Sequence, residues 1–248
     1  MWLPVIRGLI ERRILVNYRV DPDALTRMLP RLFRPQLVQG FGMAGICLIR
    51  LREVRPRGFP RWLGIGSENA AHRIAVEWDE DGEVRRGVYV LRRDTNSRLN
   101  ELAGGRIFPG VHHGAEFRVC EQKGRYEIDV TSYDGGVAIS VTGDMAETWP
   151  NGSVFGSLAE ASAFFEAGSV GYSPTNDAGR YDGLELRCKS WRVWPLALER
   201  VRSSVFDDEK IFSRGSVEFD CALLMRGVEH EWHERAEMRG EVASCCGV

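Results

Sequence analysis

Residues 126–145 read YEIDVTSYDGGVAISVTGDM, and this stretch is the clearest indication of the fold. Strand-forming residues fill its two arms, and Asp134-Gly135-Gly136 lies between them. Glycine adopts the positive φ angles that tight hairpin turns require. We therefore predict a β-hairpin with strands over residues 126–133 and 137–145.

The rest of the chain repeats this pattern of short strand-like stretches separated by turns. Asp-Gly or Lys-Gly pairs at 81–82, 123–124 and 182–183 mark further turns. Eight more stretches have strand character: residues 13–20, 43–54, 67–78, 84–93, 113–121, 184–193, 197–206 and 216–225. Ten strands without a regular alternation of strand and helix predict a mainly β chain of the α+β type, built on a large antiparallel sheet or barrel.

Three short helices are expected between the strands. Asp21 followed by Pro22 is typical of a helix N-terminus, and Ser157 and Gly168 mark the start and the end of a second helix. A third is expected from residue 96 or 97 to residue 103, before a glycine pair. Because no linker or internal repeat interrupts the pattern, we predict one domain over residues 1–248, with a tail from about residue 240.

The composition excludes several classes of protein. Of the 248 residues, 27% are charged and 44% are hydrophobic, which argues against a disordered chain or a membrane bundle. The 33 basic residues are balanced by 35 acidic ones, giving a formal net charge of −2. The chain therefore lacks the basic field on which non-specific nucleic-acid binding depends, and we expect no nucleic-acid partner.

The first residues and the cysteines predict the compartment. Charged residues interrupt the first 18 residues, so we expect no signal peptide. No stretch approaches the roughly 18 apolar residues of a membrane-spanning helix. Six cysteines are too few for a disulfide framework at this length. We predict a reduced, cytoplasmic protein with no membrane partner.

Three short motifs resemble known sites but lack the context that those sites require. Residues 40–45 (GFGMAG) have the glycines of a dinucleotide loop, but they lead into a predicted strand instead of a helix. His230 and His233 miss the spacing of a metalloprotease motif, and we interpret them as part of an exposed polar strand end. Cys245-Cys246 has no second pair that would complete a zinc site. We predict neither a metal nor a cofactor.

Two sets of residues are candidates for acid–base chemistry. Glu68 and His72 lie four residues apart in a predicted strand, so they share one face and can exchange a proton. The alternative for Glu68 is a cross-strand salt bridge to an arginine. His112 and His113 are neighbours and must point to opposite faces, so one of them faces the interior. The alternative for that histidine is a hydrogen-bonded core residue.

Several motifs along the chain follow an order that is known from one superfamily. Residues 16–25 (VNYRVDPDAL) and 28–30 (MLP), then Glu68, then residues 105–113 resemble in turn the opening strand, turn and helix, the pocket glutamate and the Gly-Arg-Glu segment of acetoacetate decarboxylase-like proteins. Residues 87–89 (GVY), 96–99 (NSRL), 194–196 (WPL) and 230–233 (HEWH) are similar to a bacterial branch of that superfamily known as a domain of unknown function. The resemblance covers nearly the whole chain.

The resemblance implies a cone-like antiparallel barrel with a few short peripheral helices and a small pocket inside. In the decarboxylases, a pocket lysine forms a Schiff base with a β-keto acid. The paired lysines of the family align here with His113-Gly114 or with His112-His113, so neither alignment supplies an amine. Lys189 is the only plausible substitute, and the glutamate that should follow Arg106 is replaced by Ile107.

These residues lead to two hypotheses for the function. In the first, Glu68, His72 and His113 are catalytic, and the protein is a lyase-like enzyme that acts by acid–base chemistry on a small carbonyl or carboxylate compound. Arg106, Arg13 and His112 are the predicted ligand-binding residues, because guanidinium groups bind carboxylates in a bidentate manner. In the second hypothesis, the same barrel holds a small ligand without catalysis. The resemblance also implies a homo-oligomer.

Overall fold

The computed structural model describes residues 4–98 and 110–240, and within them the chain is mainly β. Thirteen strands form one sheet. They are β1 (Ile6–Val20), β2 (Arg34–Pro35), β3 (Leu37–Val38), β4 (Phe41–Pro56), β5 (Ile65–Glu80), β6 (Glu83–Thr95), β7 (His112–Gln122), β8 (Arg125–Ser132), β9 (Ala138–Met145), β10 (Val170–Pro174), β11 (Arg180–Cys188), β12 (Trp194–Ser203) and β13 (Val217–Arg239). The described helices are α1 (Pro22–Thr26), the 3₁₀ turn Arg61–Leu63 and α3 (Leu158–Ala167).

The predicted hairpin is confirmed as β8 and β9. The two strands pair antiparallel, with Val130 opposite Ile139. Ser132 holds the turn, because its hydroxyl accepts a hydrogen bond from the Val137 amide at 2.8 Å. Gly135 has a φ of 71°, the left-handed conformation that the glycine was expected to supply. Alternate side chains of both strands are buried, which is the pattern of a sheet with one face in the core.

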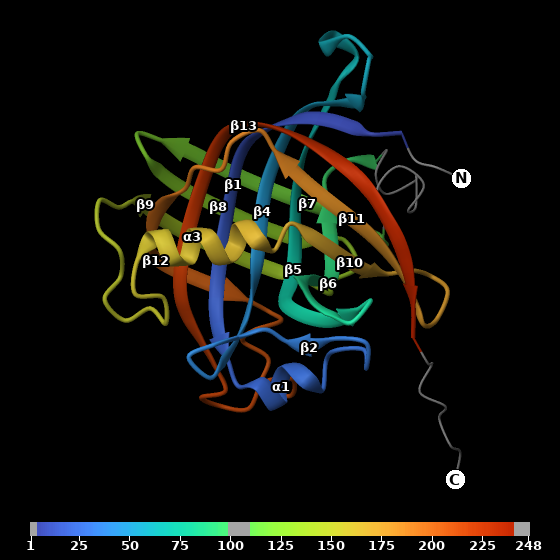
Figure 1. The fold of residues 1–248 in the computed structure, drawn as a ribbon. Coiled ribbons are helices and arrows are strands. Elements are labelled where there is room, and N and C mark those ends of the chain that lie inside the picture. Colours follow the sequence, from blue (N-terminus) through green and yellow to red (C-terminus); the bar gives the residue numbers. More distant parts are fainter. Residues whose placement is uncertain (1–3, 99–109, 241–248) are drawn as a thin grey trace.

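The strand pairings form two closed rings that share one group of strands. The shared strands are β13, β1, β4, β5 and β6, which lie side by side in Figure 1. The first ring continues from β6 through β10 and β11 back to β13. The second continues from β6 through β7, β8, β9 and β12 back to β13. The expected barrel-like sheet is therefore present, but it is mixed, because β6 pairs parallel with both β7 and β10.

The length of β13 allows it to belong to both rings. Its first half pairs with β12 at Leu223 and Leu224, and its second half pairs with β11 from His230 onwards. The expectation of an exposed strand end at His230 was wrong. Strands β1 and β11 flank this part of β13, and His230 is only 1% exposed.

The second ring encloses the main hydrophobic core. Its buried residues include Ile14, Ile74, Tyr126 and Val141, which come from the shared sheet and from the hairpin facing it. Helix α1 lies at one end of this core, where Asp21 caps it by accepting hydrogen bonds from the amides of Asp23 and Ala24. The predicted caps of this helix and of α3, with Ser157 at the start and Gly168 at the end, are confirmed.

Helix α3 crosses the other face of the shared sheet (Figure 1). Phe165 on α3 and Phe155 before it pack on Leu15, Met43 and Leu223. The helix expected over residues 96–103 falls largely on residues 99–109, which lie outside the described residues.

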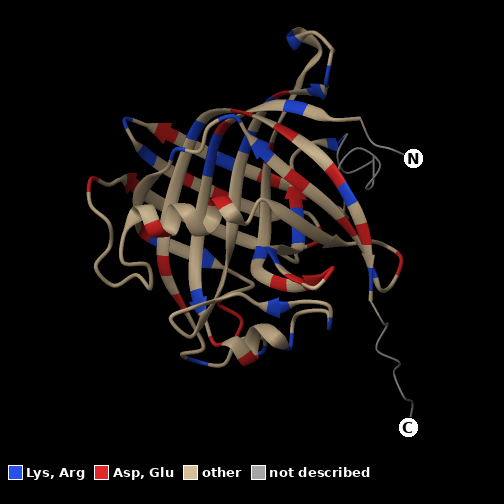
Figure 2. Ribbon diagram, viewed as in Figure 1, with Lys and Arg blue, Asp and Glu red and all other residues tan. Residues whose placement is uncertain are grey.

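Acidic and basic side chains are interspersed on the strands (Figure 2). On the outer seam of the first ring, for example, Arg187 and Arg235 both approach Glu185. Residues 40–45 lead directly into β4, so they do not have the strand–loop–helix context of a nucleotide site. In the part of the chain that the structure describes, no helix has the length and apolarity required to cross a membrane.

Candidate functional site

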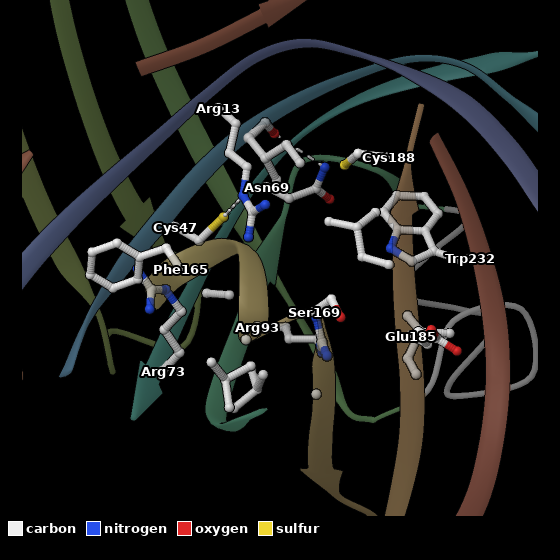
Figure 3. A pocket seen from close by; sticks show the side chains of 18 of the residues that line it. Arg13, Cys47, Asn69, Arg73, Arg93, Phe165, Ser169, Glu185, Cys188 and Trp232 are labelled. Carbon is white, nitrogen blue, oxygen red and sulfur yellow. Dashed lines mark hydrogen bonds between the residues drawn. The ribbon is translucent and has the colours of Figure 1, made fainter. Parts of the chain in front are cut away.

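A cavity of about 390 Å³ lies on the first-ring side of the shared sheet. Its walls come from β1, β4, β5 and β6 on one side, and from β10, β11, β13 and the C-terminal end of α3 on the other. Figure 3 shows the side chains around it. The ring closes tightly at the contact of β6 with β10, where a Cβ on Gly87 would lie 2.4 Å from the Val170 carbonyl oxygen.

Three arginines from three neighbouring strands line this cavity: Arg13 on β1, Arg73 on β5 and Arg93 on β6. Arg13 Nε donates a hydrogen bond to Cys47 Sγ at 3.3 Å. Arg73 Nη2 donates to the amide oxygen of Asn17 at 2.6 Å, and Arg93 Nη2 donates to Ser173 Oγ at 2.9 Å. None of these three guanidinium groups forms a salt bridge with a carboxylate among the described residues.

The absence of a carboxylate partner within residues 4–98 and 110–240 is reflected in the pKa values of two of these arginines. Burial lowers the pKa of Arg73 to about 10, and the charge of Arg13 lowers it further. Burial also lowers the pKa of Arg93 to about 10. Both groups remain protonated at neutral pH, so the cavity wall is positively charged.

His112 also lines the cavity, next to Arg93 in the pairing of β6 with β7. Its Nδ1 lies 3.2 Å from the carbonyl oxygen of Gly110. Because a carbonyl only accepts, Nδ1 carries the proton of the neutral ring and Nε2 carries the lone pair. Burial, followed by the charge of Arg93, lowers the pKa of His112 to about 4. At neutral pH this histidine is therefore an uncharged base.

Glu68 lies outside this cavity and forms an ion-pair network with arginines. Its carboxylate accepts a hydrogen bond from Arg12 Nη2 at 2.6 Å and another from Arg50 Nε. Arg12 is 1% exposed and also contacts Glu121 of β7 at 2.6 Å. The expected pairing of Glu68 with His72 or His113 is not observed, because these two arginines occupy both carboxylate oxygens.

His72 and His113 point to the second ring, on the face of the sheet opposite the cavity. His72 is fully buried, its Nε2 lies 3.2 Å from Ser203 Oγ, and burial lowers its pKa to about 4. His113 Nδ1 lies 3.0 Å from Asp134 in the hairpin turn. The structure thus does not bring the three predicted catalytic residues together at the cavity, and their catalytic role stays a prediction.

The remaining predicted residues are placed as follows. Arg13 and His112 lie at the cavity, although their ligand-binding role stays a prediction. Arg106 lies outside the described residues. Lys189 is 67% exposed and paired with Glu229, so it does not supply the cavity with an amine. Lys123 and Lys210, the other lysines of the chain, are exposed as well.

Sequence reasoning missed Arg73, Arg93 and Trp232 as cavity residues. Arg73 carried a usable signal, because it is a charged residue inside the otherwise apolar stretch 70–76 of a predicted strand. Trp232 carried none, because its position depends on the pairing of β13 with β11.

Comparison with solved structures identifies the class of fold. An acetoacetate decarboxylase from Legionella pneumophila matches with a TM-score of 0.61 and 12% identity, over 95% of this chain and 88% of that one. An acetoacetate decarboxylase-like enzyme from Sphingomonas wittichii RW1 matches with 0.59 and 12%, over 96% and 94%. The enduracididine biosynthesis enzyme MppR, complexed with pyruvate, matches with 0.60 and 13%, over 98% and 93%. The fold is that of the acetoacetate decarboxylase-like proteins, as the order of motifs predicted.

Within that class, the chain belongs to DUF2071, a family described as an uncharacterized conserved protein, whose model matches residues 10–229. The predicted membership of the domain-of-unknown-function branch is thus confirmed. No curated protein matches the sequence.

Proposed function

We propose that the cavity binds a small carboxylate or carbonyl compound through its arginines. The observation that carries this proposal is that Arg13, Arg73 and Arg93 line one cavity without a carboxylate partner among the described residues. Enclosed charges are normally paired, because an unpaired charge away from water is costly. An anionic ligand supplies the missing charge, and guanidinium groups bind a carboxylate with directed hydrogen bonds.

Pyruvate is the first ligand to test, because the structurally similar MppR was solved in complex with it. Schiff-base chemistry is not part of this proposal, since all three lysines of the chain are exposed and outside the cavity. The carbonyl group of a bound keto acid would instead be polarised by the neighbouring guanidinium groups.

Binding of pyruvate should depend on its negative charge. We expect isothermal titration calorimetry to show that pyruvate binds about 10- to 100-fold more tightly than methyl pyruvate, which has the same carbonyl but no charge. This range corresponds to a charge-assisted hydrogen bond of about 1.5–3 kcal/mol. Equal affinity for the two compounds would show that the arginines do not bind the carboxylate.

A second candidate function, acid–base catalysis on the bound compound, is favoured by His112. The uncharged ring has its lone pair on Nε2 and lines the same cavity as the arginines. In an enolisation, Nε2 would take a proton from the carbon next to the carbonyl, and the electron pair of the broken C–H bond would move to the carbonyl oxygen. Arg13 or Arg93 would stabilise the resulting enolate.

Replacing His112 should therefore abolish enolisation without abolishing binding. Loss of the methyl proton signal of pyruvate in D₂O, followed by NMR, should slow by about 100-fold or more in His112→Gln. His113→Gln is the matched control, because this neighbour points to the opposite face and contacts Asp134. In the unsubstituted protein the rate should stay constant from pH 8 to pH 5 and fall towards pH 4, as a base with a pKa of about 4 becomes protonated. A loss of exchange in His113→Gln alone would favour the original catalytic set.

A further inference from the structure

The cavity has a polar side and an apolar side. Arg13, Arg73 and Arg93 come from the shared sheet. Across from them, Leu184 and Leu186 of β11, Trp232 of β13 and Trp191 form an apolar wall. Figure 3 shows Trp232 and Arg73 at opposite sides of the cavity. A ligand that fills this space therefore meets charge at one end and hydrocarbon at the other.

The polar atoms of the apolar wall are directed away from the cavity. Trp191 donates its indole N–H to Ser162 Oγ on α3 at 3.0 Å, so its ring is fixed, and the Arg13 guanidinium lies 5.8 Å from the ring centre. Trp232 packs edge-on against the buried ring of His230, with 4.2 Å between the ring centres. Both indoles are thus positioned by the protein before any ligand binds, which lowers the entropic cost of binding.

The volume of the cavity exceeds the needs of a three-carbon keto acid. The 390 Å³ correspond to roughly thirteen water molecules at about 30 Å³ each. This is within the range of about 300–1,000 Å³ that is typical of sites for larger ligands. Pyruvate on the arginines would leave the tryptophan wall in contact with water, which is unfavourable for apolar surface.

We propose that the ligand is an amphipathic carboxylate, most simply a 2-oxo acid with an apolar tail longer than that of pyruvate. The carboxylate lies on the arginines, and the tail packs on Trp191, Trp232 and Leu186. This inference rests on the proposed carboxylate site for its charged end, and it adds the class of substrate that the site selects.

The test is a calorimetric titration with a series of straight-chain 2-oxo acids from pyruvate to 2-oxooctanoate. Each added methylene that enters the apolar side should tighten binding by roughly fourfold until the wall is covered. Trp232→Ala should flatten this series while leaving the affinity for pyruvate within about threefold. Leu186→Ala is a second, smaller truncation in the same wall, and Trp62→Ala is the control, because Trp62 is 80% exposed and outside the cavity.

Repeating the series with Arg93→Gln separates this inference from the proposed function. If affinity rises with tail length and falls in Arg93→Gln, both are supported. If pyruvate binds in an Arg93-dependent manner but the series is flat, the amphipathic ligand is wrong and the carboxylate site stands. If the series rises but Arg93→Gln has no effect, the carboxylate site is wrong, and with it this class of ligand. Absence of binding throughout would overturn both.

Discussion

Glu68→Gln is expected to lower the free energy of unfolding by about 3 kcal/mol and to leave the affinity for pyruvate unchanged. The carboxylate of Glu68 is the partner of Arg12 and Arg50, and Arg12 is almost completely buried. Removing one member of a buried ion pair leaves an uncompensated charge, which typically costs about 3–5 kcal/mol. We take the lower end, because Glu121 still contacts both arginines. Urea denaturation monitored by circular dichroism measures the change.

Glu116→Gln provides the control for this substitution. Glu116 pairs with Arg118 on the surface of β7, with side chains that are 53% and 76% exposed. Exposed pairs contribute about 0–1 kcal/mol, so this variant should unfold almost like the parent protein. A folded, fully stable Glu68→Gln protein that no longer binds or enolises pyruvate would reverse the interpretation and return Glu68 to the site.

The strands and helix caps were predictable because their signals are local. Alternating side chains and an Asp-Gly-Gly turn define the hairpin of β8 and β9, and Asp21 and Ser157 cap α1 and α3 by bonding amides a few residues away. What no local signal contained was the closure of two rings. That closure depends on short contacts between distant strands, such as the pairing of Gly171 with Val88 and of Leu184 with Glu234.

The closure of two rings also explains why the candidate site was only partly predicted. In a sheet shared by two rings both faces are covered, and the burial along β5 is nearly continuous as a result. The prediction that Glu68 and His72 share a face is correct, since both point to the second ring. The sequence does not indicate which face borders the cavity, because polar residues occur on both. Arg73, on the other face of the same strand, marks the cavity side.

Neighbouring residues on β1 show the consequence of this arrangement. Arg12 and Arg13 are adjacent in sequence and face opposite rings. Arg12 has two carboxylate partners within 2.6 Å, whereas Arg13 has Cys47 and the ring of Trp191. One arginine therefore stabilises the fold, and the other is available to an anion. The two should respond in opposite ways to substitution.

Arg13→Gln is expected to weaken pyruvate binding by about 30-fold or more and to leave the free energy of unfolding unchanged or raised by up to about 1 kcal/mol. The loss of affinity reflects a charge-assisted hydrogen bond of about 1.5–3 kcal/mol. The gain in stability follows because Arg13 and Arg73 are like charges in one cavity, and the charge of Arg13 helps to lower the pKa of Arg73. Calorimetry gives the affinity, and urea denaturation without ligand gives the stability.

Arg7→Gln is the matched control on the same strand, because Arg7 pairs with Glu231 at 2.8 Å and lies outside the cavity. It should bind pyruvate like the parent protein. A site that holds cations together for an absent anion is strained when empty, so function and stability oppose each other there. If Arg13→Gln instead lost stability and kept its affinity, Arg13 would be a structural residue like Arg12, and the anion would have to be held by Arg73 and Arg93 alone.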